Sequence, residues 1–108
     1  MDNLTQVKEK IDLVEGNILD QSLVGRLVSE SDYIVHLAAA LGVLNIVNKP
    51  LESLLTNIRG TENVLEAANL RKIPVFLTSS SEVYGKNTSD SLKESDDRVL
   101  GSPITLRW

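Results

Sequence analysis

The stretch YIVHLAAA at residues 33–40 is followed by a long helical pattern and then by VFLT at residues 75–78, and this order decides the fold. Both apolar runs are rich in β-branched or large apolar residues, which is typical of strands buried on both faces of a sheet. Between them, residues 50–70 keep apolar side chains at helical spacing after Pro50, a residue suited to the first helical turn. We therefore expect a strand, a helix of about 20 residues and a parallel strand, joined by a right-handed crossover.

A strand and a helix are also predicted before this unit. Residues 11–15 (IDLVE) partly alternate in polarity and end at Gly16, which indicates a strand followed by a turn. Asp20 can accept hydrogen bonds from the first turn of a helix. The apolar face of that helix would consist of Leu23, Val24, Leu27 and Val28. Three strands alternating with two main helices predict an α/β fold with a parallel sheet, and the polar stretch from Lys86 onward predicts an extended loop.

The composition narrows the class of protein. A chain of 108 residues with 42% apolar and 24% charged residues fits one soluble domain, and its polar start lacks the features of a secretion signal. We expect a cytoplasmic protein without a membrane partner. The absence of cysteine excludes disulfides and thiolate catalysis, and a single histidine excludes a multi-histidine metal site. A net charge of -4 argues against nucleic-acid binding, and we interpret the acidic residues after position 89 as a solvated loop rather than a metal site.

Ligands of open parallel sheets bind beyond the carboxyl ends of the strands. In this sequence those ends carry Gly16-Asn17, Leu37-Ala38-Ala39 and Ser79-Ser80-Ser81-Glu82. The sequence therefore predicts that small and polar residues from three separate segments form the binding site.

Four motifs, in this order, resemble the extended short-chain dehydrogenase/reductase family. They are EGNI at 15–18, HLAA at 36–39, NIRGTENVLEAA at 57–68 and TSSSEVYG at 78–85. The resemblance extends from about residue 11 to residue 108. It implies a Rossmann-like NAD-binding domain from a nucleotide-sugar epimerase, dehydratase or decarboxylase, including enzymes similar to UDP-glucuronate decarboxylase and UDP-glucose 4-epimerase. Such enzymes oxidise the sugar at C4, alter the keto intermediate and reduce it again.

The resemblance assigns NAD-binding roles to the first two motifs. Asn17 stands where the family usually has an aspartate that accepts a hydrogen bond from the adenine amino group, and Ile18 follows it. An amide oxygen can accept the same bond, although Asn17 could instead merely close a turn. Leu37, Ala38 and Ala39 would let the backbone pass close to the cofactor.

Ser79 is also a cofactor-binding candidate by resemblance, and Asn57 would provide a polar contact behind the catalytic tyrosine. Asparagine is a poor helix former, which suggests that the Asn57 side chain is needed. Gly60 in the same helix suggests close packing against a neighbour, and a packing explanation remains open for both residues. We interpret His36 as a structural residue.

Ser80 aligns with the catalytic Ser/Thr of the family, which hydrogen-bonds the sugar hydroxyl that is oxidised. Ser81 and Glu82 occupy the next two positions, where members that decarboxylate or dehydrate have a similar Ser-Glu or Asp-Glu pair. A carboxylate there can act as an acid or a base, so Glu82 favours decarboxylase or dehydratase chemistry over 4-epimerisation. Glu82 could instead cap the turn after the strand. A hydrolase built on Ser80 and His36 is disfavoured because the pattern G-x-S-x-G is absent.

Two segments of the family pattern do not occur in the sequence. There is no G-x-x-G-x-x-G turn, and neither Tyr33 nor Tyr84 has a lysine four residues later. We therefore expect residues 1–108 to form a partial NAD-binding domain, which lacks the glycine-rich β-α-β start and everything from the Tyr-x-x-x-Lys helix onward. Such a chain is expected to be inactive by itself, and a non-catalytic α/β binding or assembly module is the alternative.

The missing strands also affect the sheet. In the family order 3-2-1-4-5, the strand at residues 11–15 is separated from the next one by two strands that this sequence does not contain. We expect the chain either to re-pair its strands or to complete the sheet with another copy. The resemblance further implies a homo-oligomer formed through the helix at residues 50–70, with a nucleotide-sugar, such as a UDP-sugar, as the substrate of the full-length form.

Overall fold

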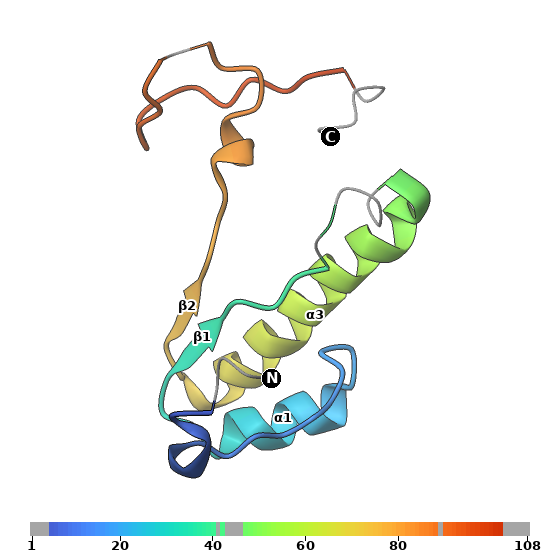
Figure 1. Cartoon of the computed structure of the whole chain (residues 1–108), viewed down its shortest axis with the longest axis vertical. Coiled ribbons are helices and arrows are strands. Elements are labelled where there is room, and N and C mark those ends of the chain that lie inside the picture. The colour runs from blue at the N-terminus through green and yellow to red at the C-terminus, as the bar shows by residue number, and fades with distance from the viewer. Residues whose placement is uncertain (1–4, 41, 43–46, 89, 103–108) are drawn as a thin grey trace.

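The computed structural model describes residues 5–40, 42, 47–88 and 90–102 (Figure 1). The helices are α1 (Gln21–Ser29) and α3 (Pro50–Arg71), the strands are β1 (Ile34–His36) and β2 (Val75–Leu77), and the short 3-10 helices are η2 (Lys8–Lys10) and η3 (Ser81–Tyr84). The two strands pair in parallel, with Val35 opposite Phe76. The predicted α/β class and the strand–helix–strand unit are therefore confirmed.

Both main helices begin where the sequence predicts. The carboxylate of Asp20 accepts a hydrogen bond from the backbone N–H of Leu23 at 3.0 Å, which caps α1. Helix α3 starts with Pro50 in its first turn. It ends at Lys72, whose left-handed backbone (φ 57°) directs its N–H back to the carbonyls of the last turn.

The third predicted strand, at residues 11–15, is not formed. The backbone at Ile11 is extended (φ -131°, ψ 144°), but residues 12–15 belong to no helix or strand. The only sheet in the described part of the chain has the order β1-β2. An extended segment becomes a strand only when a neighbouring strand supplies its hydrogen bonds, and the described residues contain no such neighbour for it.

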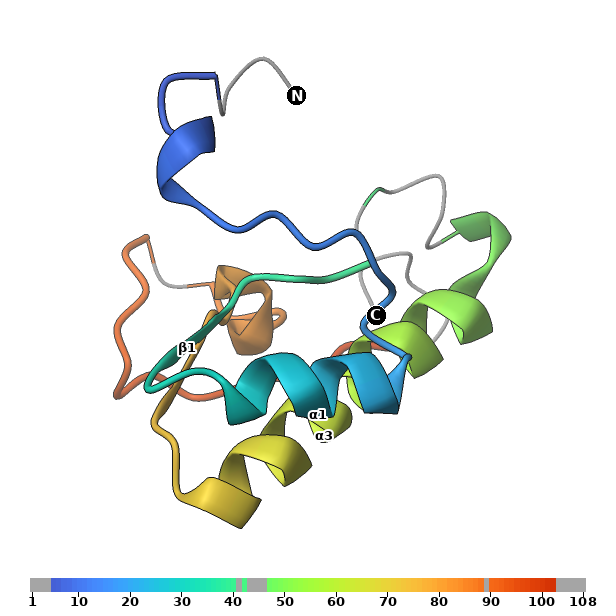
Figure 2. The same cartoon turned by 90° about the horizontal axis from the view of Figure 1, so that it is seen from below.

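The helices pack on each other and cover one face of the strand pair. Figure 2 shows α1 and α3 lying together on the same side of β1. The buried apolar residues of the described part are Val28, Val64 and Ala68. The expectation that both strands are buried on both faces is wrong, because Val35 and Phe76 remain 56% and 52% exposed. Only the opposite face, which includes His36, meets α3.

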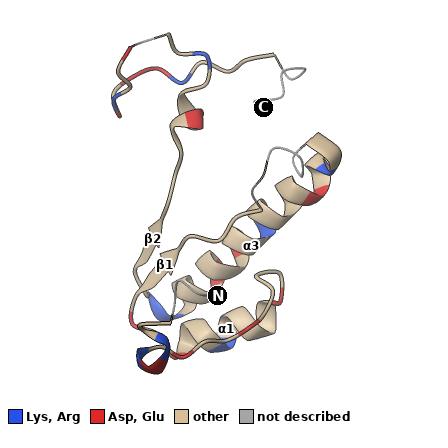
Figure 3. Cartoon of the chain, in the orientation of Figure 1, with Lys and Arg blue, Asp and Glu red and all other residues tan. Residues whose placement is uncertain are grey.

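After β2 the chain runs away from the helices to η3 and a C-terminal loop (Figure 1). Gly85, with φ 65°, forms an isolated parallel bridge with Val99. The backbone N–H of Lys86 donates to the carbonyl of Val99 at 2.9 Å, which closes the loop. The predicted loop from Lys86 onward is confirmed, and its charged residues are spread along it (Figure 3).

Within the residues that the structure describes, the helices fall short of the combined length and apolar character that a bilayer crossing requires.

Candidate functional site

A cavity of about 330 Å³ lies where the segment after β1 passes α3 and the turn before α1. Five residues that the sequence predicted as cofactor-binding line it together. These are Asn17, Ile18, Ala38, Ala39 and Asn57. Gly16, Ala40, Thr56 and Thr61 complete the wall. Three segments that are distant in the sequence therefore meet at one place, as expected for the carboxyl end of a parallel strand.

Asn57 in α3 fixes the segment that follows β1. Its side-chain oxygen accepts a hydrogen bond from the backbone N–H of Ala40 at 2.6 Å, and its amide nitrogen donates to the Ala40 carbonyl at 3.5 Å. The Asn57 side chain thus makes the hydrogen bonds with the backbone of Ala40 that a neighbouring strand would otherwise make. This contact explains why an asparagine is placed in the interior of a helix.

The turn before α1 is held by residues of α3 that follow Asn57. Asn63 donates from its amide nitrogen to the carbonyl of Ile18 at 3.0 Å. A Cβ atom built on Gly60 would lie 2.6 Å from Cγ2 of Ile18, a distance that a real side chain could not keep. The packing explanation for Gly60 is therefore supported, since its missing side chain lets Ile18 approach α3.

Asn17 closes a turn in the structure. Its side-chain oxygen accepts from the N–H of Leu19 at 2.9 Å, and its backbone carbonyl accepts from Asp20 at the same distance. An amide oxygen has two lone pairs, so turn closure uses one of them and leaves the other able to accept from a ligand.

Leu37 and Ser79 do not line the cavity. Leu37 is 64% exposed, although it directly follows β1. The last contact between the two strands is made by Thr78, whose N–H and hydroxyl approach the carbonyl of His36 at 3.5 and 3.4 Å. Beyond this point the chain after β1 turns toward α3 and the chain after β2 departs (Figure 1).

The predicted catalytic residues Ser80, Ser81 and Glu82 therefore lie at a separate corner. The hydroxyl of Ser80 accepts a hydrogen bond from the backbone N–H of Glu82 at 3.2 Å, so that Ser80 caps the short helix η3. All three residues are exposed. Ser80 is therefore the N-cap residue of this turn.

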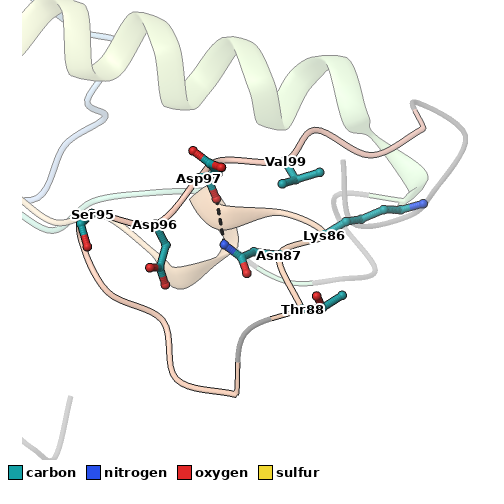
Figure 4. Close-up of a pocket in the computed structure, with 7 residues that line it drawn as sticks. All are labelled: Lys86, Asn87, Thr88, Ser95, Asp96, Asp97 and Val99. Atoms are coloured by element: carbon teal, nitrogen blue, oxygen red, sulfur yellow. Dashed lines mark hydrogen bonds between the residues drawn. The ribbon is translucent and has the colours of Figure 1, made fainter.

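A second cavity, of about 410 Å³, lies in the C-terminal loop (Figure 4). Lys86, Asn87, Thr88, Ser95, Asp96, Asp97 and Val99 line it. The amide of Asn87 donates to the backbone carbonyl of Asp97 at 3.0 Å, and the carboxylate of Asp96 accepts from the N–H of Lys93 at 2.9 Å. Across the described ranges, no three acidic or histidine side chains are grouped to hold a metal ion.

Thr61 and Asn63 position the site but were not identified from the sequence. Thr61 contacts His36 and also lines the cavity. Its spacing of four residues from Asn57 places both side chains on the same side of α3, and this spacing was the available signal.

A parallel β-α-β unit with a cavity at the carboxyl end of its first strand defines an α/β domain of the nucleotide-binding kind. Comparison with known proteins identifies the family. The profile described as GDP-mannose 4,6 dehydratase matches residues 1–103. The chain belongs to this family of extended short-chain dehydrogenases/reductases, as the four motifs predicted.

Similar proteins include enzymes of three activities. The UDP-N-acetyl-alpha-D-glucosaminuronate decarboxylase of Bacillus cytotoxicus is 42% identical over 98 residues, or 91% of this chain and 30% of that protein. The dTDP-glucose 4,6-dehydratase of Mycolicibacterium smegmatis is 42% identical over 84 residues, 78% of this chain and 25% of that protein. The crystal structure of UDP-glucose 4-epimerase from Brucella ovis in complex with NAD has a TM-score of 0.73 at 30% identity, covering 82% of this chain and 28% of that one. The chain thus spans less than a third of the length of these relatives.

Proposed function

We propose that this chain forms part of the NAD site of a nucleotide-sugar-modifying enzyme and that it catalyses no turnover by itself. The observation that supports this is the cavity in which Asn17, Ala38 and Asn57 meet from three segments. The Brucella ovis structure, which contains NAD, has the same local fold. Bound NAD would accept a hydride from the sugar and later return it.

The chemistry of the cavity fits the uncharged part of the cofactor. Its volume of about 330 Å³ lies at the lower end of small-molecule sites, so it suits one portion of a dinucleotide. Ala38 and Ala39 present little side chain, and Asn17 offers an amide oxygen to an amino group. No lysine or arginine is among the described lining residues, and the N-terminus of α1 is already capped by the Asp20 carboxylate. We therefore assign the cavity to the adenosine portion rather than to the pyrophosphate.

For the catalytic corner, we propose that Ser80 binds the sugar hydroxyl and that Ser81 and Glu82 act on the keto intermediate. The Ser80 hydroxyl accepts from Glu82 N–H and can still donate its own proton. The relatives named as a decarboxylase and a dehydratase support this chemistry over 4-epimerisation. The corner lies apart from the cavity, and the sequence contains no Tyr-x-x-x-Lys, which supports inactivity of the chain alone.

Three further expectations belong to the same proposal. The substrate class is a nucleotide-sugar, because the relatives carry UDP- and dTDP-sugars in their names. The chain acts in the cytoplasm, without membrane or nucleic-acid partners. It also forms a homo-oligomer.

Isothermal titration calorimetry with NAD tests the proposal. We expect weak binding, with a Kd on the order of 1 mM, because only part of the cofactor is held. Ala39→Leu should abolish this binding by filling the cavity, and the exposed position of Ala39 means that the fold should be retained. Leu100→Ala, in the exposed C-terminal loop, should bind NAD like the wild type.

Two outcomes would contradict the proposal. If the folded chain shows no heat with NAD, the alternative of a non-catalytic binding or assembly module is favoured. If the chain with NAD and a UDP-sugar produces NADH absorbance or a new sugar, the expected inactivity is wrong.

A further inference from the structure

One residue of the cavity wall is tied to a buried side chain. Thr61 lines the cavity of about 330 Å³, and its hydroxyl oxygen lies 3.0 Å from Nε2 of His36. His36 is 6% exposed. Its backbone carbonyl is approached by the N–H and the hydroxyl of Thr78, at 3.5 and 3.4 Å. His36 is therefore held from two sides, by the end of β2 through its backbone and by α3 through its ring.

The contact between these two side chains decides what the Thr61 hydroxyl can offer to a ligand. A hydroxyl has one hydrogen and two lone pairs, and an uncharged imidazole has one nitrogen that carries hydrogen and one that accepts. If Nε2 of His36 accepts, the Thr61 hydrogen is directed at the ring and only a lone pair remains for the cavity. If Nε2 carries a hydrogen, the Thr61 hydrogen is free to point into the cavity. The state of one ring nitrogen thus sets the hydrogen-bonding role of this part of the wall.

The surroundings of His36 favour an uncharged ring with Nε2 as the acceptor. A charged ring buried to this degree would need a carboxylate partner. Within the described ranges, none of the ion pairs involves His36, and β2 carries no charged residue. Threonine in a helix commonly donates to a carbonyl of the preceding turn, whereas the hydroxyl of Thr61 contacts the ring. The ring therefore provides the acceptor for the Thr61 hydrogen.

The adenosine portion of NAD, to which the cavity is assigned under the proposed function, has donors that fit such a wall. These donors are the amino group of the base and the ribose hydroxyls. The side-chain oxygen of Asn17 keeps one lone pair beyond its bond to the N–H of Leu19. Asn17 and Thr61 thus offer acceptors from two sides of the same cavity, and each can take a different donor of the ligand.

We propose that Thr61 is a ligand-binding residue of the cavity and that His36 positions its hydroxyl. The hydrogen of Thr61 goes to Nε2 of His36, and the Thr61 oxygen accepts a hydrogen bond from a donor of the adenosine portion. His36 itself touches no ligand, which agrees with its structural role. The inference rests on the proposed function, because it places the adenosine portion in the same cavity.

NMR titration with adenosine and with analogues that lack one kind of donor tests the contact. 2′,3′-Dideoxyadenosine lacks two ribose hydroxyls, and purine riboside lacks the amino group. In the wild type, the analogue without the donor that meets Thr61 should bind about five- to tenfold more weakly than adenosine. This difference should disappear in Thr61→Val and persist in Thr61→Ser, which keeps the hydroxyl. Comparing two ligands on each variant separates the contact from a general change in stability.

Thr88→Val is the matched control, because it removes the same hydroxyl from an exposed residue of the C-terminal loop. It should discriminate between the ligands like the wild type. Far-UV circular dichroism checks the folding of each variant. If Thr61→Val does not fold, the ring nitrogens of the wild type decide. The chain contains one histidine, so heteronuclear NMR observes this ring without overlap. Nε2 should carry no hydrogen, and adenosine should shift its signal.

The outcomes separate this inference from the proposed function. If adenosine and NAD bind but Nε2 carries a hydrogen, only the inference is overturned. The same holds if both analogues bind the wild type as well as adenosine does, or if Thr61→Val discriminates between the ligands like the wild type. If the folded chain binds neither adenosine nor NAD, both the inference and the proposed function are overturned.

Discussion

The imidazole Nε2 of His36 lies 3.0 Å from the hydroxyl oxygen of Thr61, and this hydrogen bond joins β1 to α3. His36 is only 6% exposed, so Thr61 satisfies a polar group that water barely reaches. This geometry confirms the interpretation of His36 as a structural residue. It also leaves a Ser80–His36 hydrolase without support, because the buried His36 imidazole contacts Thr61, whereas Ser80 caps η3 at a separate corner.

Thr61→Val should lower the free energy of unfolding by about 1–3 kcal/mol, because it leaves the buried imidazole without its partner. The shape of the side chain is nearly unchanged, so the loss would report the hydrogen bond. Urea denaturation followed by circular dichroism measures it. Thr88→Val makes the same chemical change at an exposed position and should have little effect. Equal stability of the Thr61 variant and the wild type would show that the contact contributes nothing.

Replacement of two helical glycines by alanine should change the stability of the chain in opposite directions. Gly25 in α1 has no atom within 4 Å of a built Cβ, so Gly25→Ala should stabilise the chain by about 0.5–1 kcal/mol through helix propensity. At Gly60 the same Cβ would meet Ile18, a β-branched residue that cannot easily move aside. We expect Gly60→Ala to lose about 1 kcal/mol or more despite its better propensity. Thermal unfolding of the pair tests this, and a stabilised Gly60→Ala would contradict the packing role.

The helices could be predicted from the sequence because their signals are local. Asp20 marks a helix start because its carboxylate can cap the first turn, and Pro50 marks one because its ring suits the first helical position. Both predictions are confirmed. The strand at residues 11–15 depends on a distant partner, and its local alternation could not reveal that the partner is missing among the described residues. The prediction that the strands are buried was wrong for the same reason. Val35 is an apolar residue of the kind found in cores, but it lies on a face of the strand pair that no described element covers.

The candidate site was predicted in part. Strand ends and small residues indicated Asn17, Ala38 and Ala39, which do meet in one cavity. Ser79 and the catalytic candidates were expected nearby because parallel strands end at the same edge. The chain instead diverges after Thr78, where no further strand pairing holds the two segments together. The distance between the segments that follow β1 and β2 depends on the elements that pack over them. The residues of these two segments do not reveal which elements do so.

The N-cap of α1 provides a third test of local structure. Asp20→Ala removes the carboxylate that accepts from Leu23 N–H, and it should cost about 1 kcal/mol of stability. Asp12→Ala removes the same charge from an exposed position outside any helix or strand, and it should be nearly neutral. Chemical denaturation of both variants at one ionic strength separates the cap from a general charge effect. Equal losses in the two variants would argue that the cap is not the cause.

Asn57 should control the mobility of the cavity wall, because it holds both backbone groups of Ala40. Asn57→Ala removes the acceptor for the Ala40 N–H, so exchange of that amide with deuterium should accelerate locally. Asn57→Asp keeps an oxygen at that position and should preserve the protection of the Ala40 amide, which separates the hydrogen bond from helix propensity. Asn87→Ala removes a contact in the C-terminal loop and should leave Ala40 unaffected. Unchanged exchange at Ala40 in Asn57→Ala would show that the wall is held by packing rather than by this side chain.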